Sequence, residues 1–576
     1  MKLLLTAVNA KYIHSNLAVY SLRAYAKEYR SQIELAEYTI NHRQEYILSG
    51  IYKSRPDILC FSCYIWNLDL VLSVAEEFHK LRPEVPIWMG GPEVSYETEA
   101  FLREHPFVTG VMVGEGEQSF SELCEYYANE ERRDGIKAEE RPETIKGLAF
   151  LDEDGHMVFT GAREPIDMST IPFCYENMED FKNRIIYYES SRGCPFRCSY
   201  CLSSIEKKLR FRDIELVKRE LAFFIEKEVP QVKFVDRTFN CDHKHAMEIW
   251  KFIREHDRGI TNFHFEIAAD LLTDEEIAFI SGLRPGLIQL EIGVQTTHPE
   301  TITEIHRKMD LTRVKQVVRE IKKNKNVHQH LDLIAGLPYE DYETFQKSFD
   351  EIYALKPEQL QLGFLKVLKG SFLFEHAKEY GIVYGSRPPY EVLKTAWLDY
   401  DAVLKIKQVE EMLEVYYNSR QYPMSIRLLE TRFESAFAMF AALGTYYEKH
   451  GYFSMSHSRI RRLEILLAFA EEIDGEHLDV LKEAAVYDIY SRENAKSRPA
   501  FADDQTEYKE LAHRFCKKGK MQHLERFYYI MPEKETVKEL PERQKEPCYL
   551  LFDYEKRDAL NHQADIHPVD PKKEEA

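Results

Sequence analysis

Two successive series of short apolar runs, which alternate with amphipathic stretches, constrain the fold of this chain more than any other feature. Alternation of this kind predicts strands joined by helices, and therefore parallel sheets whose ligands lie beyond the carboxyl ends of the strands. The expected strands are residues 3–8, 33–40, 58–65, 85–89 and 108–113 in the first series, and 185–189, 232–236, 263–268, 287–293, 330–335 and 359–367 in the second.

The two series predict two α/β domains of different kinds. The first is typical of a doubly wound parallel sheet, with helical patterns such as residues 68–81 between its strands. The second supplies six strand–helix units, which predict a partial (β/α)6 barrel whose reactive end is formed by the strand C-termini. Between them lie a charged stretch at 130–142 and the turn sequence Asp152-Glu153-Asp154-Gly155, which together predict a connector with a hairpin.

Helical periodicity dominates the chain after residue 395 and predicts a mostly helical C-terminal region. The expected helices are residues 409–417, 426–440, 460–473 and 479–490, and two apolar-aromatic runs at 527–531 and 548–554 are expected to be strands. The expected domains are therefore residues 1–130, a connector at 131–183, the barrel at 184–380, the helical region at 381–560 and a disordered tail at 561–576.

The net charge, the lengths of the apolar runs and the number of cysteines argue against a nucleic-acid-binding, membrane-spanning or disulfide-rich protein. The 576 residues carry a formal net charge of −20, which opposes bulk binding to nucleic acid phosphates. No run approaches the roughly 18 apolar residues that cross a bilayer, and the apolar run at 3–8 lacks a cleavage pattern. Ten cysteines are too sparse for a disulfide framework. We therefore expect a soluble protein of the reducing cytoplasm.

Three cysteines lie within eight residues, directly after the first expected barrel strand. Cys194, Cys198 and Cys201 have C-x3-C-x2-C spacing. Three thiolates can hold three irons of a [4Fe–4S] cluster and leave the fourth iron open to another ligand. The alternatives are coincidence or a zinc loop, but a structural zinc site normally has four protein ligands, and the sequence offers no fourth partner nearby.

This motif, with the aromatic Tyr200 before its last cysteine, resembles that of radical S-adenosylmethionine enzymes. In that family the open iron binds the amino and carboxylate groups of S-adenosylmethionine. One-electron reduction by an external donor, such as flavodoxin or ferredoxin, then releases methionine and a 5′-deoxyadenosyl radical. The resemblance implies that Cys194, Cys198 and Cys201 are the cluster ligands and that Tyr200 lies against the adenine.

Later segments resemble the strand motifs of the same family. The resemblance implies that Asp236 lies near the methionine moiety, that Glu291 and Gln295 reach the ribose and methionine, and that the backbone at Ile334 meets adenine. One segment departs from the family pattern, because Asp270 stands where many relatives carry an arginine. That departure removes the basis for a cofactor contact at this position.

The N-terminal domain resembles that of the cobalamin-dependent class of this family. The similarity rests on residues 87–93 and 113–120, whose glycines would let backbone approach a bulky nucleotide tail. Ser62 and Tyr64 follow the neighbouring strand and would hydrogen-bond to that tail. The resemblance implies cobalamin binding by Ser62, Tyr64, Gly90, Gly91, Gly114, Glu115 and Glu117.

The sequence lacks the D-x-H-x-x-G element that supplies an imidazole to cobalt. His14 lies in the corresponding loop, where a packing role is expected, so cobalamin should bind without a protein histidine. Cys60 and Cys63 are expected to be small buried hydrophobes. Methylthiolating tRNA enzymes would need three separated N-terminal cysteines for a second cluster, and Cys60, Cys63 and Cys124 are spaced wrongly for it.

Two histidine pairs, His243 with His245 and His328 with His330, are expected to be solvated or to pack, and no catalytic residue is assigned. The leading hypothesis is a radical methyltransferase that uses cobalamin, S-adenosylmethionine and the cluster on a small-molecule or peptide substrate. A second is cobalamin-assisted rearrangement or cyclisation without methyl transfer. A third is a cobalamin-binding regulator or scaffold, which would have no need of an open iron.

Overall fold

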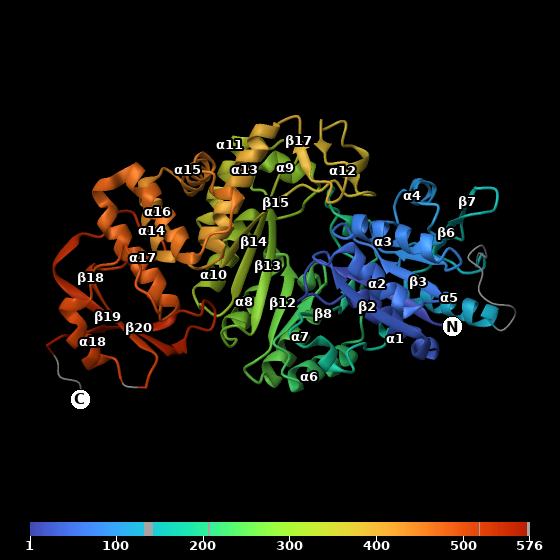
Figure 1. The fold of residues 1–576 in the computed structure, drawn as a ribbon, viewed down its shortest axis with the longest axis horizontal. Coiled ribbons are helices and arrows are strands. Elements are labelled where there is room, and N and C mark those ends of the chain that lie inside the picture. Colours follow the sequence, from blue (N-terminus) through green and yellow to red (C-terminus); the bar gives the residue numbers. More distant parts are fainter. Residues whose placement is uncertain (132–141, 206–207, 518, 573–576) are drawn as a thin grey trace. The chain divides into compact units, whose positions relative to one another are not determined.

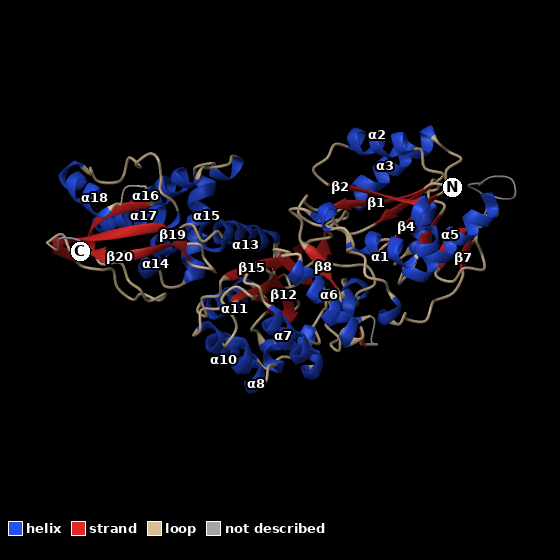
Figure 2. Ribbon diagram, turned by 90° about the horizontal axis from the view of Figure 1, so that it is seen from below, coloured by secondary structure: helices blue, strands red, loops and turns tan. Residues whose placement is uncertain are grey.

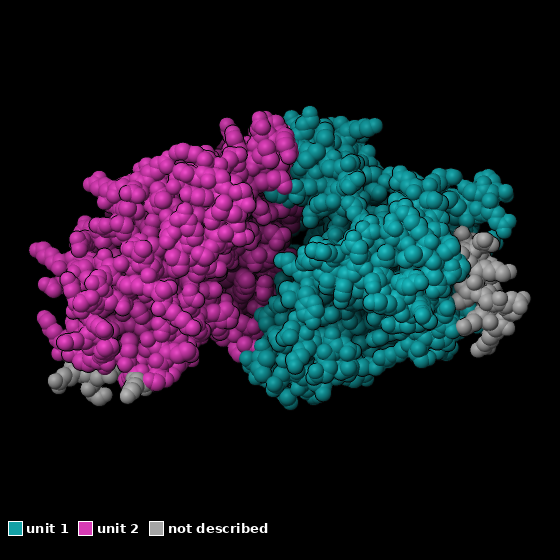
Figure 3. Space-filling view, in the orientation of Figure 1, with its two compact units in different colours: residues 1–276, 303–309, 364–396 teal, residues 277–302, 310–363, 397–576 magenta. Residues whose placement is uncertain are grey.

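The computed structural model describes residues 1–131, 142–205, 208–517 and 519–572. Most of the charged stretch at 130–142 and the last four residues of the expected tail lie outside this part of the chain. The chain divides into two compact units, coloured separately in Figure 3. Unit 1 comprises Met1–Glu276, Thr303–Met309 and Phe364–Ala396, and unit 2 comprises Ile277–Ile302, Asp310–Gly363 and Trp397–Ala576.

The N-terminal sheet is doubly wound, as the alternation predicted. Its strand order is β2-β1-β3-β4-β5-β6-β7, and the first five strands run parallel. Helices α2 and α3 pack together on one face and α1 and α5 on the other, as Figure 2 shows. The bounds are β1 Leu3–Asn9, α1 Leu17–Tyr25, β2 Ile33–Thr39, α2 Gln44–Ser54, β3 Ile58–Ser62, α3 Leu68–Leu81, β4 Ile87–Gly90, α4 Thr98–Glu104, β5 Gly110–Met112 and α5 Glu117–Glu131.

The expected hairpin forms, but it belongs to this sheet instead of standing apart as a connector. Strands β6 (Leu148–Leu151) and β7 (Met157–Phe159) pair antiparallel, and β6 pairs with β5. The physical reason is that the edge of β5 would otherwise leave its backbone donors and acceptors unpaired. Both faces of the sheet are covered at its centre, because every residue of β1 and β3 is buried.

All six strands expected in the second series are present, in the order β15-β14-β13-β12-β11-β8 (Figure 1). Strand β11 pairs parallel with β8 and with β12, and β13 pairs parallel with β14. The bounds are β8 Ile186–Tyr188, α6 Ile214–Glu226, β11 Gln231–Phe234, α7 His243–His256, β12 Asn262–Ile267, α8 Asp274–Ser281, β13 Ile288–Gln295, α9 Pro299–Glu304, α10 Leu311–Lys322, β14 His328–Ala335, α11 Tyr342–Tyr353 and β15 Gln359–Phe364.

The C-terminal region is mostly helical, as expected, and ends in a three-stranded antiparallel sheet, β18-β19-β20. None of the helices that the structure describes is both long enough and apolar enough to cross a membrane. The bounds are α12 Phe372–Glu375, β16 Val383–Tyr384, β17 Val392–Lys394, α13 Tyr400–Leu413, α14 Pro423–Leu429, α15 Ala436–Lys449, α16 Arg459–Asp474, α17 Leu478–Arg492, α18 Lys509–Phe515, β18 Gln522–Tyr529, β19 Arg543–Arg557 and β20 Ala564–Val569.

Two expectations for this region were wrong. The single helix expected at 426–440 is two helices, α14 and α15, because Ser435 caps a new helix with its side chain accepting from the Ala438 amide. The tail expected to be disordered contains β20, which pairs along the long strand β19. That edge offers backbone partners to a polar segment that has no strong strand pattern of its own.

Candidate active site

The three clustered cysteines follow strands β8 and β9 (Ser191–Arg192) of unit 1. Strand β9 pairs with β10 (Arg210–Phe211), and this pairing brings the chain close to Gly193. Gly193 has a φ of +93°, and a Cβ there would stand 2.7 Å from the backbone oxygen of Lys208. Only glycine therefore allows the chain to turn into the cysteine loop at this point.

The thiols themselves lie in a partly buried, cationic setting. Cys198 is 7% exposed, and Cys194 and Cys201 are half-buried. Arg307 donates from Nη1 to Cys198 Sγ at 3.7 Å and to the Tyr200 hydroxyl at 3.2 Å. Burial raises the pKa of the Cys198 thiol, and the Arg307 guanidinium opposes that rise. Arg307 therefore favours the thiolate form that binds iron.

Backbone hydrogen bonds from distant segments hold this loop. The Ser199 amide donates to Ile305 O at 2.9 Å, and the Leu373 amide donates to Ser199 O at 3.0 Å. Thr238 Oγ1 lies 3.6 Å from Cys194 Sγ. Three free thiols lie on this one loop, which hydrogen bonds hold in place, and they form a donor set suited to an iron–sulfur cluster with three protein ligands.

Asp236 lies two residues after the end of β11 and binds the segment that precedes the cysteine loop. Its side chain is fully buried and accepts from the Ser190 amide at 3.0 Å, and from the hydroxyls of Ser190 and Ser191 at 2.6 Å. Burial raises the pKa of this carboxyl, while the three hydrogen bonds oppose the rise. Asp236 thus orders the turn before the cysteines, and its contact with S-adenosylmethionine stays a prediction.

In unit 2, three further candidate residues share one face of β13 and β14. Glu291, Gln295 and Ile334 are half-buried, whereas the residues that alternate with them along β13 are buried. Gln295 has a φ of +74° at an irregularity in the β13–β14 register. Its Oε1 is buried and has no hydrogen-bond partner within the described ranges. An orphaned amide oxygen at a strand end fits a polar ligand such as S-adenosylmethionine.

The strand ends of the N-terminal sheet carry the candidate cobalamin residues. Ser62 ends β3, where its hydroxyl accepts from Asn16 Nδ2 at 3.4 Å, and the Tyr64 ring stacks on Trp66 at 4.5 Å. Gly90 ends β4. Gly91 has a φ of +120°, and a Cβ there would stand 2.3 Å from Cys63 O. Gly91 is therefore required for packing against the backbone of Cys63, a reason independent of any nucleotide tail.

Gly114 differs from Gly91 in what surrounds it. Its φ is +86°, and among the described residues outside its chain neighbours no heavy atom lies within 4 Å of an added Cβ. The backbone beyond β5 thus leaves open space of the kind that an approaching cofactor needs. This opening fits the cobalamin assignment of the 113–120 segment.

The glutamates of the same segment are engaged in ion pairs. Glu115 Oε1 accepts from Arg192 Nη1 at 3.0 Å and from Arg210 Nη2 at 2.7 Å. Glu117 Oε1 accepts from Arg192 Nη2 at 2.5 Å, and Glu189 accepts from Arg192 Nε at 2.9 Å. We call Arg192, Arg210, Glu115, Glu117 and Glu189 the arginine–glutamate network. It joins the loop after β5 to the strand that precedes Cys194, and contact of these glutamates with cobalamin stays a prediction.

His14 and three cysteines of the N-terminal domain, which the sequence left without a cofactor role, lie among other protein groups. His14 Nδ1 lies 2.6 Å from the Tyr187 hydroxyl, and burial lowers the pKa of His14. The side chains of Cys60, Cys63 and Cys124 are all buried, as expected of small apolar residues. Burial raises the pKa of the Cys124 thiol to about 12, which keeps it protonated.

The other histidine pairs mainly meet neighbouring side chains. His243 lies 3.0 Å from Glu276, and His245 Nε2 lies 3.0 Å from Ser190 Oγ. His330 Nε2 lies 3.1 Å from Asp332 Oδ1 on the same strand. Packing roles fit the first pair.

Sequence reasoning missed the arginines of this site. Arg192 stands two residues before Cys194 and could have been noticed as a charge beside the motif, since the glutamates of 113–120 were already selected. Arg210 and Arg307 carried no such signal, because their partners lie 95 and 109 residues away in the chain. Only the folded structure brings these pairs together.

Three family profiles match the chain. The profile described as "B12 binding domain" matches residues 3–124, and that described as "Radical SAM superfamily" matches residues 188–352. The profile described as "Protein of unknown function (DUF4080)" matches residues 378–546. The candidate cobalamin residues fall inside the first match, and the cysteines and strand residues fall inside the second.

Two curated relatives match about half of this chain. The 2-(S-pantetheinyl)-carbapenam-3-carboxylate methyltransferase of Streptantibioticus cattleyicolor is 26% identical over 320 residues, which cover 50% of this chain and 44% of the relative. The anaerobic magnesium-protoporphyrin IX monomethyl ester cyclase of Rubrivivax gelatinosus is 23% identical over 319 residues, which cover 53% and 56%. The chain thus spans about half the length of these relatives.

One solved structure shows the same fold over a larger share of the chain. It is the cobalamin-dependent S-adenosylmethionine radical enzyme OxsB, solved with aqua-cobalamin and S-adenosylmethionine bound. The TM-score is 0.56 at 14% sequence identity, and the match covers 82% of this chain and 79% of that one.

Proposed function

Since this chain is a member of the radical SAM superfamily that carries an N-terminal B12-binding domain, we propose that it is a methyltransferase acting on an unactivated centre of a small-molecule or peptide substrate. The observation that carries the proposal is the arginine–glutamate network, because it ties the loop of the B12-binding domain to the cysteine loop. Two reagents used in one reaction need such a fixed arrangement. The methyltransferase relative supports the same reading.

The residues of this chain have separate tasks in that reaction. When bound, the [4Fe–4S] cluster supplies the electron that cleaves S-adenosylmethionine, and cobalamin carries the methyl group. Cys194, Cys198 and Cys201 would hold the cluster, and Arg307 would hold Cys198 as a thiolate. Gln295 would bind S-adenosylmethionine through its orphaned amide oxygen.

Other residues would shape the two cofactor pockets without touching the reacting atoms. The open backbone at Gly114 would receive the cobalamin tail, with Ser62 and Tyr64 at the neighbouring strand end. Asp236 would order the turn before the cluster loop, and Arg192 would hold that turn against the loop at Glu115. The C-terminal helical region, which carries the third family match, would recognise the substrate.

The environment and partners follow from the same chemistry. We propose a reducing cytoplasm as its compartment, and the ten free thiols and the proposed oxygen-sensitive cluster support this proposal. The reaction needs an external one-electron donor such as flavodoxin or ferredoxin. Bulk nucleic acid is not an expected partner at a net charge of −20.

A second candidate, cyclisation or rearrangement without methyl transfer, is favoured by one observation. The cyclase relative matches at nearly the same identity as the methyltransferase relative. The two candidates share their cofactors and differ in their products, because only methyl transfer converts S-adenosylmethionine into S-adenosylhomocysteine.

The test uses the full chain, reconstituted anaerobically with iron, sulfide and cobalamin and then incubated with S-adenosylmethionine, reduced flavodoxin and cell extract. We expect 5′-deoxyadenosine and S-adenosylhomocysteine from the unmodified protein. Cys198→Ala should yield neither, whereas Cys516→Ala, the same substitution at a half-buried free thiol of the C-terminal region, should yield both. Formation of 5′-deoxyadenosine without S-adenosylhomocysteine would contradict methyl transfer and favour cyclisation or rearrangement. Absence of both products would contradict both enzymatic hypotheses and favour a cobalamin-binding regulator or scaffold.

A further inference from the structure

The loop that follows β14 carries one exposed aromatic side chain at the carboxyl end of the second sheet. Tyr339 lies four residues beyond the end of β14, and its exposed fraction is 39%. Its neighbours in the chain, Pro338 and Glu340, are both buried. Because ligands of parallel sheets lie beyond the carboxyl ends of the strands, an exposed ring at this position is placed to meet a bound molecule.

Hydrogen bonds hold the backbone on both sides of Tyr339. Thr301 Oγ1 donates to Pro338 O at 2.8 Å, and Thr296 Oγ1 donates to Glu340 Oε1 at 2.6 Å. Thr296 is the first residue after β13, so the second of these bonds also joins the loop after β13 to the loop after β14. The chain is therefore fixed before and after Tyr339, and the ring is kept outside the core.

Tyr339 adopts a backbone conformation that suits glycine better. Its φ is +64°, in the left-handed region where the Cβ of an L-residue is crowded. Gln295, which ends the adjacent strand β13, also has a positive φ, of +74°. Strain of this kind persists only where the surrounding structure enforces it, and it concentrates at binding and catalytic sites. Two such residues at the ends of adjacent strands therefore indicate a ligand site.

Trp397 contacts the ring of Tyr339 and helps to hold it. The two ring centroids are 4.5 Å apart, and the ring planes are inclined by 37°. Two rings in direct contact leave no space for a cation between them, so the pair is not an aromatic cage for an ammonium group. The exposed part of the Tyr339 ring suits a flat ring instead, because aromatic rings attract one another in stacked or edge-to-face contact.

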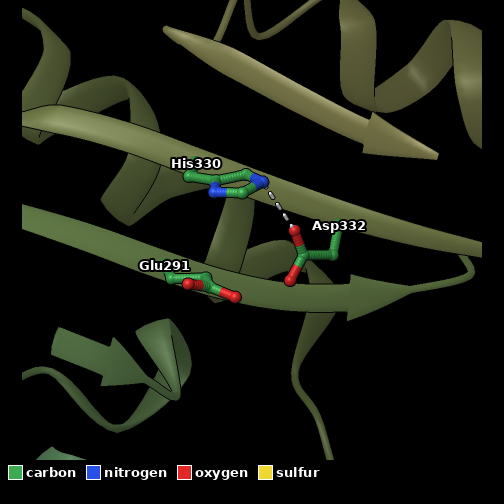
Figure 4. Close-up of side chains that lie close together, drawn as sticks. All are labelled: Glu291, His330 and Asp332. Carbon is green, nitrogen blue, oxygen red and sulfur yellow. Dashed lines mark ion pairs between the residues drawn. The ribbon is translucent and has the colours of Figure 1, made fainter. Parts of the chain in front are cut away.

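The strands that precede these loops carry polar side chains on one face. Glu291 on β13 and His330 and Asp332 on β14 lie on it, and Figure 4 shows these side chains close together. His330 Nε2 lies 3.1 Å from Asp332 Oδ1. Gln295 belongs to the same face of β13, by the alternation of side chains along a strand. This end of the sheet thus combines polar groups on the strands with one exposed aromatic ring in the loop.

We propose that Tyr339 is a specificity-determining residue that stacks on a flat aromatic or heteroaromatic ring of the substrate. This inference rests on the proposed function, because it assumes a substrate that binds beside S-adenosylmethionine at the ends of β13 and β14. Trp397 holds the Tyr339 ring in place for that contact. The strained backbone at Tyr339 is kept because a glycine, which would relieve the strain, has no ring to offer.

The experiment measures ring binding and folding stability, so its outcome does not depend on methyl transfer. The full chain is reconstituted anaerobically with its cluster and cobalamin and is saturated with S-adenosylmethionine, without a reductant. Indole-3-acetamide, a neutral probe with a flat ring, is titrated in, and its binding is followed by saturation-transfer nuclear magnetic resonance. Cyclohexaneacetamide, a neutral amide with a saturated ring, is the comparison probe. We expect the flat probe to bind about fivefold more tightly.

Tyr339→Gly removes the ring and accommodates the positive φ. It should bind indole-3-acetamide about fivefold more weakly, yet unfold at the same or a higher urea concentration, as followed by circular dichroism. Tyr339→Phe keeps the ring and should bind the probe as the unmodified chain does. The control, Tyr52→Ala, removes another exposed tyrosine ring, on α2, and should leave the affinity unchanged.

Four results would overturn the proposal. The first two are equal affinity of Tyr339→Gly and the unmodified chain, and no preference of the unmodified chain for the flat probe. The third is a lower unfolding midpoint of Tyr339→Gly, because the ring would then be kept for packing. The fourth is binding of the probe only when S-adenosylmethionine is absent, because Tyr339 would then contact the adenine ring of that cofactor.

Discussion

Replacement of Arg192 by methionine tests the arginine–glutamate network most directly. The change keeps an unbranched side chain of similar length and removes the guanidinium that donates to Glu115, Glu117 and Glu189. The side chain of Arg192 is 16% exposed and that of Glu117 is 6% exposed, so the carboxylates left behind are poorly hydrated. Among the described residues, Arg210 remains as a second arginine partner for Glu115 but not for Glu117 or Glu189.

The magnitude follows from these contacts. A hydrogen bond to a charged partner contributes about 1.5–3 kcal/mol, but contributions within one network do not add. Breaking a buried ion pair by removing one partner costs about 3–5 kcal/mol, and we expect Arg192→Met to lower the free energy of unfolding of unit 1 by this amount. The control, Arg103→Met, breaks the exposed pair with Glu99 and should cost about 0.3–0.5 kcal/mol.

Urea unfolding followed by tryptophan fluorescence measures this difference. Three of the four tryptophans, Trp66, Trp88 and Trp250, lie in unit 1, so the signal reports mainly on that unit. A double-mutant cycle with Glu117→Gln should give an interaction energy of about 0.5–3 kcal/mol. Equal unfolding midpoints for Arg192→Met and Arg103→Met would refute the argument that the network is an energetic link between the two loops.

Three further predictions concern single positions. Burial raises the pKa of Glu340 from 4.5 to about 7, so its stabilising contribution is fully present below pH 4.5 and is lost as the pH rises through 7. Thermal melts at pH 5.5 and 8.5 should therefore show a loss of about 2 kcal/mol that Glu340→Gln abolishes and exposed Glu343→Gln does not. Gly91→Ala should destabilise the N-terminal domain by about 1–3 kcal/mol or more, because a Cβ at this positive φ would stand 2.3 Å from Cys63 O. Gly90→Ala should be tolerated in the same urea assay, because the nearest atoms to its Cβ would be 3.6 Å away. Arg307→Met should lower the iron content after reconstitution, because the Cys198 thiol loses the cation that opposes its raised pKa; iron content equal to that of the unmodified chain would contradict this role.

Local pattern was sufficient to predict most of the fold. All eleven strands expected in the two α/β series are present, since buried strands between amphipathic helices have a periodicity that the chain displays locally. The failures lie where pairing with a distant segment decides the outcome. The polar segment of β20 becomes a strand only because β19 offers it an edge, and β6 joins the first sheet only because β5 has an unpaired side.

The candidate site divides in the same way. The sequence by itself determined the cysteine spacing, the glycine-containing strand ends and the residues that face one side of β13 and β14, because these depend on neighbours along the chain. Only the tertiary structure decided that Arg307 lies against Cys198, that Arg192 binds Glu115 and Glu117, and that Gly91 packs on Cys63. Ion pairs and close backbone approaches between residues that lie 28 to 109 positions apart in the chain leave no local periodicity, so the folded chain alone specifies them.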